Sequence, residues 1–293
     1  MTSRPHPLIW AAISASLVSL GALGWLARDL LNGGGGRADA RPSLLDLLDD
    51  VGRSGGSTTP AAPRRPAPAP PDPLRWTSPL ARACPAADPA TRQRLSTALA
   101  QLPSLRERVV IDPSNYGRRY RQDAFGNPLD PTPRVVVLHE TVSSLSSAIN
   151  TFKTPHPRDE DQVSYHTLVG LNGEILDTVP PERRAFGAGY SAFSGQWAVT
   201  NPAVGGSINN FALHLSLETP KDGEDEEGEH SGYTAAQYDA ASLVLADWIR
   251  RFQISPQAIT THRHVDLGGA RGDPRSFDWS ELQIRLAALG VLC

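Results

Sequence analysis

The sequence predicts an α/β fold, in which a mixed β-sheet is flanked by helices. The segment VVVL at residues 135–138 is apolar without a break, which is typical of a strand buried on both faces. From residue 211 to residue 218, apolar and polar side chains alternate, which predicts a strand with one core face and one polar face. Helical patterns are interleaved with such strands, and this order is typical of helices packed on a sheet.

A hairpin is predicted in the middle of the chain. Residues 163–169 have the composition of a strand, and Asn172-Gly173 is a turn pair typical of a β-hairpin. Residues 174–179 follow as the next strand. We therefore expect these two strands to pair with each other in the sheet.

The helices are predicted from their first residues and from the spacing of apolar side chains. Asp88 precedes a proline, and that order is typical of an N-cap followed by the first helical turn. Thr234 and Gln237 have the spacing of a capping box. Apolar residues recur at helical spacing after both starts, and also in residues 145–152 and 278–290. Helices are therefore expected in four places around the sheet.

Composition divides the chain into three parts. Residues 8–27 carry no charge and are just long enough to span a bilayer, so residues 1–30 are predicted to be a signal-anchor, with a cleavable signal peptide as the alternative. Residues 31–75 are rich in glycine and proline and are predicted to be a disordered linker. Residues 76–293 are predicted to form the folded domain.

Charge and cysteine content restrict the partners and the compartment. The net charge of −3 gives no reason to expect a nucleic-acid partner. The chain has two cysteines, Cys84 and Cys293, which bracket the folded domain. In an oxidising compartment they would form an intramolecular disulfide, whereas in a cytosolic protein they would be two unpaired thiols. The anchor and the linker favour the disulfide.

Residues 261–279, THRHVDLGGARGDPRSFDW, predict one half of a metal site. They contain two histidines, three aspartates and three arginines. Hydrolytic zinc sites use three protein ligands, usually histidine and carboxylate, and leave a fourth position for water. His262 and Asp273 are eleven positions apart, which suits a loop that leaves the metal and returns to it. His139, at the end of the buried strand, is well placed to be the third ligand.

At these residues the chain resembles the zinc-dependent N-acetylmuramoyl-L-alanine amidases, a family that includes the peptidoglycan recognition proteins and some phage lysozymes. The similarity covers residues 134–279 and rests on the order of VVLHET, SYH and THR with a later DP. It implies that His139, His262 and Asp273 bind Zn²⁺. It also implies a hydrolase that acts on peptidoglycan or muropeptides, at the amide bond between N-acetylmuramic acid and L-alanine.

The same resemblance supplies candidate catalytic residues. Tyr165 matches the tyrosine that one branch of the family places beside the attacking water. Arg271 falls where many members have a lysine that stabilises the oxyanion. Members without the tyrosine use a glutamate on the strand that corresponds to residues 211–218. That position holds Ser216 here, with Glu218 two residues on and on the same predicted face.

Two histidines and one glycine near the candidate site also have expected roles. His264 stands where many members have aspartate, and we expect it to affect how the metal ligands are oriented. Gly187, in FGAG, stands where many members have histidine, and we expect it to change how the substrate is held. His166 is expected to point away from Tyr165 and to be structural.

Two other functions stay open at this stage. A non-catalytic peptidoglycan-binding module would keep the fold without hydrolysis, and a zinc peptidase would cut elsewhere. The HExxH motif of many zinc peptidases is absent from the sequence, which disfavours the peptidase. An amidase with this anchor is expected in the cell envelope. It would be attached to the membrane with an extracytoplasmic, periplasmic catalytic domain, or secreted if the signal is cleaved.

Overall fold

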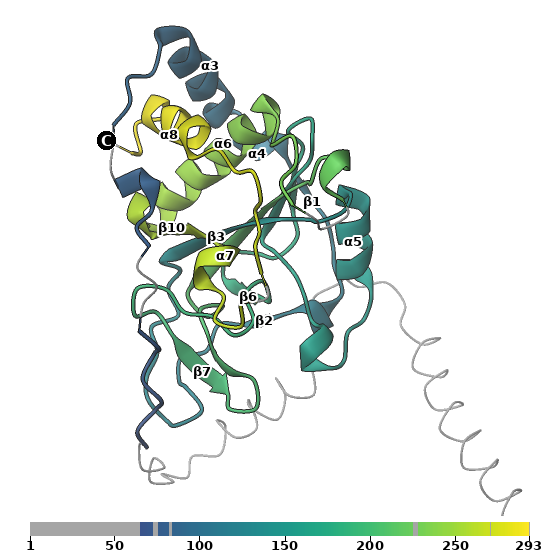
Figure 1. Cartoon of the computed structure of the whole chain (residues 1–293), viewed down its shortest axis with the longest axis vertical. Helices are drawn as coiled ribbons and strands as arrows, with labels where there is room; N and C mark the ends of the chain where they lie inside the picture. The colour runs from purple at the N-terminus through teal and green to yellow at the C-terminus, as the bar shows by residue number, and fades with distance from the viewer. Residues whose placement is uncertain (1–64, 73–75, 82–83, 225–227, 270, 293) are drawn as a thin grey trace, which may run out of the picture. The chain divides into compact units, whose positions relative to one another are not determined.

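The structure is a computed structural model that describes residues 65–72, 76–81, 84–224, 228–269 and 271–292 (Figure 1). No helix in these ranges is long and apolar enough to cross a membrane. The predicted span at residues 8–27 lies outside them. The predicted boundaries at residues 30 and 75, and the disulfide to Cys293, also rest on residues outside the described ranges, so they stay predictions.

The main sheet is mixed, as predicted. Its strand order is β1-β5-β4-β9-β3-β10. Strands β4, β9, β3 and β10 run parallel to one another, β5 is antiparallel to β4, and β1 is parallel to β5. The bounds are Arg106–Arg108 for β1, Val135–Glu140 for β3, Thr167–Val169 for β4, Ile175–Asp177 for β5, Ala212–Leu217 for β9 and Ile259–Thr261 for β10. The predicted hairpin is therefore the β4–β5 pair.

Two small antiparallel pairs lie outside this sheet. Strand β2, Tyr116–Arg118, pairs with β6, Arg183–Ala185. Strand β7, Ala198–Asn201, pairs with β8, Gly205–Ser207. The segments that carry them form part of the wall of the cavity described below.

The predicted helix starts are confirmed. Asp88 accepts hydrogen bonds from the second and third residues after it, and Thr234 forms a capping box with Gln237. The α-helices are α3 Pro89–Ala100, α4 Leu102–Leu105, α5 Leu145–Lys153, α6 Ala235–Phe252, α7 His262–Val265 and α8 Trp279–Ala288. The 3₁₀ turns are η1 Pro79–Ala81, η2 Pro113–Asn115, η3 Asp159–Asp161, η4 Lys221–Gly223 and η5 Pro256–Ala258. In Figure 1, α3, α6 and α8 gather at one side of the sheet, with α5 apart from them.

The two faces of β3 and β9 have different neighbours. Leu138 and Leu215 are buried in the same core cluster as Leu245 and Trp248 of α6. Successive side chains of a strand point to opposite faces, so His139 at the end of β3 lies on the face turned away from these helices. Along β9, that face carries the side chains that the alternation predicted to be polar, His214 and Ser216 among them. The fold therefore places His139, His214 and Ser216 on one face of β3 and β9.

Candidate active site

Sheet register brings the two predicted histidine ligands together. In the parallel pair of β10 and β3, Thr261 is aligned with Leu138. His262 follows Thr261 as the first residue of α7, and His139 follows Leu138. Because parallel strands end at the same edge of a sheet, the two imidazoles meet there, with ring centroids 4.7 Å apart.

Asp273 reaches both histidines through a folded loop. The carboxylate of Asp266 accepts hydrogen bonds from the backbone N–H groups of Gly268 and Arg271, at 3.0 and 2.9 Å. The chain then returns so that Asp273 Oδ2 lies 3.2 Å from Nδ1 of His139, and its Oδ1 lies 3.0 Å from Nδ1 of His262. The loop therefore leaves the site and comes back to it, as the spacing predicted.

His139 and Asp273 have the charges that metal binding requires. Burial lowers the pKa of His139 to about 4, although its hydrogen bond to Asp273 acts in the opposite direction. Burial raises the pKa of Asp273, but hydrogen bonds with His139 and His262 outweigh it and hold that pKa well below its usual range. At neutral pH the site therefore holds a neutral His139 and an ionised Asp273, which are the ligand forms that bind a metal.

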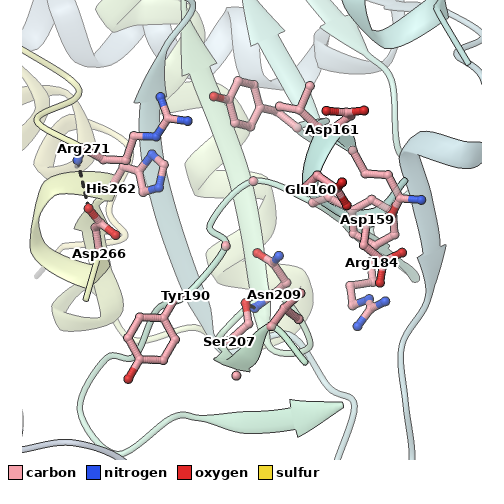
Figure 2. A pocket seen from close by; sticks show the side chains of 18 of the residues that line it. Asp159, Glu160, Asp161, Arg184, Tyr190, Ser207, Asn209, His262, Asp266 and Arg271 are labelled. Atoms are coloured by element: carbon pink, nitrogen blue, oxygen red, sulfur yellow. Dashed lines mark hydrogen bonds between the residues drawn. The ribbon is translucent and has the colours of Figure 1, made fainter. Parts of the chain in front are cut away.

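A cavity of about 750 Å³ opens beside these residues. His262 and Asp273 are part of its lining, together with Tyr165 and Arg271. Figure 2 shows His262 and Arg271 on one side and Arg184 on the opposite side of the view. His262 and Asp273 are thus accessible from the cavity, whereas His139 is buried.

Tyr165 and Arg271 lie within reach of the ligands. The Tyr165 ring stacks on His139, with centroids 4.4 Å apart and an angle of 24°. Burial raises the pKa of Tyr165, and the charge of Asp273 raises it further, so its hydroxyl stays protonated at neutral pH. The positive charge of Arg271 acts to lower the pKa of both Tyr165 and His139. The structure therefore brings five of the six predicted site residues together.

Residues 129–276, about half of the chain, match the family model of the N-acetylmuramoyl-L-alanine amidases, Amidase_2. The chain belongs to this amidase family. It is 29% identical over 122 residues to the 1,6-anhydro-N-acetylmuramyl-L-alanine amidase AmpD of Citrobacter freundii, covering 42% of this chain and 56% of the relative. It is 27% identical over 123 residues to AmpD of Escherichia coli K12, covering 42% and 58%. The chain thus spans little more than half the length of these curated relatives.

A solved structure described as a selenomethionine derivative of AmpD is also similar to this amidase-family chain. The alignment covers 62% of this chain and 95% of the other, with 24% sequence identity and a TM-score of 0.45.

In this member of the amidase family, Glu218 lies apart from the other candidates. Its carboxylate accepts hydrogen bonds from the backbone N–H of Leu145, at 2.7 Å, and of Leu171, at 2.9 Å. It therefore fastens the start of α5 and the β4–β5 turn, and it is absent from the described residues that line the cavity. The alternation that grouped Glu218 with Ser216 does not extend to it, because β9 ends at Leu217.

Ser216 and His214 occupy the face of β9 that looks toward His139. Ser216 is the register partner of His139, and its buried hydroxyl has no hydrogen-bond partner among the described residues. Nδ1 of His214 lies 2.9 Å from Nε2 of His139. Sequence reasoning placed His214 on the polar face but gave it no role. The available signal was its position two residues before Ser216 on the same face.

The remaining positions are structural or lie at the cavity wall. His264 stacks on Trp76, with ring centroids 4.1 Å apart, so it attaches the first described part of the domain to α7. His166 packs edge-on against Trp248 of α6, as expected for a structural residue. Gly187 lines the cavity. A Cβ atom added to Gly187 would lie 2.5 Å from Nδ1 of His214, so glycine leaves the space that the His214 ring fills.

Proposed function

We propose that this chain hydrolyses the amide bond between N-acetylmuramic acid and L-alanine in peptidoglycan, with Zn²⁺ as its cofactor. The observation that carries the proposal is the cluster of His139, His262 and Asp273 at the wall of a large cavity. Family membership and the names of the curated relatives, which are anhydromuramyl-L-alanine amidases, support the same reaction. Peptidoglycan fragments are therefore the substrate class to test first.

The residues present fit a zinc ion. Two imidazole nitrogens and one carboxylate oxygen lie within 4.8 Å of one another, and this is the ligand set of many hydrolytic zinc sites. Zinc in such a site acts as a Lewis acid and lowers the pKa of water, so that a nucleophile forms near neutral pH. The neutral His139 and the ionised Asp273 need neither gain nor lose a proton to bind it.

Tyr165 and Arg271 have separate roles in this proposal. The hydroxyl of Tyr165 stays protonated, so it orients the attacking water by hydrogen bonding and does not act as a phenolate base. The guanidinium of Arg271 stabilises negative charge that develops on the carbonyl oxygen of the scissile amide. Arginine keeps its proton in proteins, so Arg271 does not serve as the general acid.

The test is metal content followed by product analysis on the full chain in mild detergent. Elemental analysis should find about one zinc per chain, and the His262→Ala variant should lose it. The zinc-loaded chain should release stem peptides that begin with a free L-alanine amino terminus. Cuts inside the stem peptide would indicate a peptidase. Binding of peptidoglycan without any cut would indicate the binding module, and absence of zinc in the unmodified chain would reject the hydrolase.

We also propose that the catalytic domain works outside the cytoplasm, attached to the membrane by residues 1–30 or secreted after their removal. The apolar segment at residues 8–27 and the linker that follows it support this location. Protease added to intact spheroplasts should degrade the domain. Protection of the domain until the membrane is lysed would contradict the proposal.

A further inference from the structure

A row of three buried imidazoles extends from the candidate metal site into the fold. His139 is followed by His214, with ring centroids 5.2 Å apart, and His214 by His166, at 5.7 Å. All three side chains are almost completely buried. His214 is absent from the described residues that line the cavity, and its ring lies within hydrogen-bond distance of the candidate ligand His139. His214 is the middle ring of this row and contacts both of the others.

The two nitrogens of His139 have different partners. Nδ1 faces Asp273 at 3.2 Å, on the side where the ligand atoms of the cluster converge. Nε2 faces Nδ1 of His214 at 2.9 Å. A ring nitrogen that binds a metal carries no proton, so the proton of a neutral imidazole must then be on the other nitrogen. With Nδ1 as the ligand atom, Nε2–H of His139 donates to Nδ1 of His214.

We propose that His214 is a positioning residue, which holds the His139 ring with Nδ1 directed at the metal. The proposal rests on the zinc site put forward above. A ring held by hydrogen bonding at Nε2 cannot turn that nitrogen toward Asp273 and His262. Partners of this kind fix both the orientation and the protonated nitrogen of ligand histidines.

His214 is itself held in place from two sides. Its backbone N–H donates to Nδ1 of His166 at 3.0 Å, and its carbonyl oxygen accepts from the backbone N–H of His166 at 2.9 Å. The other side of the ring lies against Gly187, where even a methyl group would collide with it. The acceptor offered to His139 is therefore fixed by the fold.

The contact between His139 and His214 also determines which ring nitrogens carry protons with and without metal. When Nδ1 of His214 accepts, its own proton is on Nε2, which is buried and has no partner among the described residues. Without metal, Nδ1–H of His139 donates to Asp273, and the bond between the two rings reverses, with Nδ1–H of His214 as the donor. Metal binding thus moves one proton from Nδ1 to Nε2 on each ring, with no net gain or loss of protons.

Two variants of the full chain test whether His214 acts by accepting a hydrogen bond or only by filling volume. Leucine in His214→Leu fills a similar volume but leaves Nε2–H of His139 without an acceptor. Asparagine in His214→Asn has an oxygen near the place of the original Nδ1. The zinc dissociation constant, measured by competition with a chelating dye, should rise about 10–100-fold in the leucine variant. The asparagine variant should recover most of the affinity.

Nitrogen NMR of the histidine rings gives a second readout. In the unmodified chain, His139 and His214 should carry their protons on Nδ1 without zinc and on Nε2 with zinc. Unchanged affinity in His214→Leu, equal weakness in both variants, or an unchanged His214 tautomer would each overturn the proposal. If the unmodified chain bound no zinc at all, the proposed function would fail instead, and the two failures are thereby distinguished.

Discussion

The two faces of β9 serve different purposes. Leu213, Leu215 and Leu217 on one face are fully buried against the helices, where volume and apolar contact decide the free energy of folding. His214 and Ser216 on the other face are equally buried but contain polar atoms without partners among the described residues. Unpartnered buried polar atoms lower stability, so this face of β9 is more costly to bury than the leucine face. The comparison teaches that burial alone does not distinguish the core from the site.

The largest effect is expected where the polar face of β9 meets the proposed metal site. Asp273→Ala should abolish zinc binding and hydrolysis, because it removes the carboxylate that faces both histidines. Elemental analysis and muropeptide turnover measure both. Asp278→Ala is the matched control, since Asp278 caps α8 and should cost about 1 kcal/mol of stability while zinc is retained. Zinc retained by the Asp273 variant would contradict the assignment.

A second pair of variants compares two candidate catalytic groups. Tyr165→Phe should lower kcat about 100-fold or more, because the hydroxyl is lost while the ring that stacks on His139 is kept. Glu218→Gln should leave kcat nearly unchanged, because its carboxylate binds only backbone N–H groups of Leu145 and Leu171 among the described contacts. Steady-state kinetics on a defined muropeptide decide between them. A large loss of kcat in Glu218→Gln and a small one in Tyr165→Phe would show that Glu218 is the catalytic group.

On the face of the sheet that packs against the helices, a substitution should lower stability and leave zinc binding unchanged. Leu215→Ala should lower the free energy of unfolding by about 2–5 kcal/mol, because the cavity left behind cannot collapse fully. Denaturant titration of the zinc-free protein gives this number. Zinc stoichiometry of the folded fraction should stay at that of the unmodified chain, and a loss of zinc would mean that the two faces are not separable.

Gly187 tests how tightly the polar face is packed. Gly187→Ala should lower the free energy of unfolding by about 1–3 kcal/mol, because its Cβ would lie 2.5 Å from the His214 ring. His214→Ala should relieve that cost when the two changes are combined. A double-mutant cycle of denaturation midpoints measures the coupling, and additive effects would show that the two side chains do not compete for space.

For a single residue, the smallest effect is a dependence of stability on pH in the zinc-free protein. Burial lowers the pKa of His139 to about 4, and lowers those of His166 and His214 well below the ordinary value. The unfolded chain then binds more protons below pH 6.5, so the free energy of unfolding should fall as the pH decreases from 6.5 toward 4. Each such histidine contributes at most about 1.4 kcal/mol per pH unit. Denaturation at pH 7.5 and pH 5.5 measures this, and equal stability would mean that burial does not lower the pKa values of these histidines.

Much of the fold and of the site follows from local patterns. The uninterrupted apolar segment before His139 and the alternation around Leu215 predicted β3 and β9, because side-chain direction repeats every two residues in a strand. The candidate ligand His262 was placed with Asp273 by loop spacing and family resemblance. These predictions depend on residues close together in the chain, and the structure confirms that the side chains meet.

The positions that sequence reasoning missed depend on distant contacts. Glu218 was grouped with Ser216, but it is the first residue after the end of β9, where the alternation stops. The partner of His214 lies 75 residues earlier in the chain, and its ring packs beside Gly187 on a separate segment. No local pattern reports such a contact. The role of His264 was likewise undefined until Trp76 was found stacked upon it.

Gly187 and His214 share one space, so a change of residue at one position restricts which residues the other position can accept. A family member with histidine at the position of Gly187 has no room for a second large ring at the position of His214. We therefore expect the two positions to covary, with a small residue at one wherever a large residue stands at the other. Homologues that have the large side chain at position 214 should form a recognisable subgroup. In that subgroup, a side chain of β9 would hold the histidine at the end of β3.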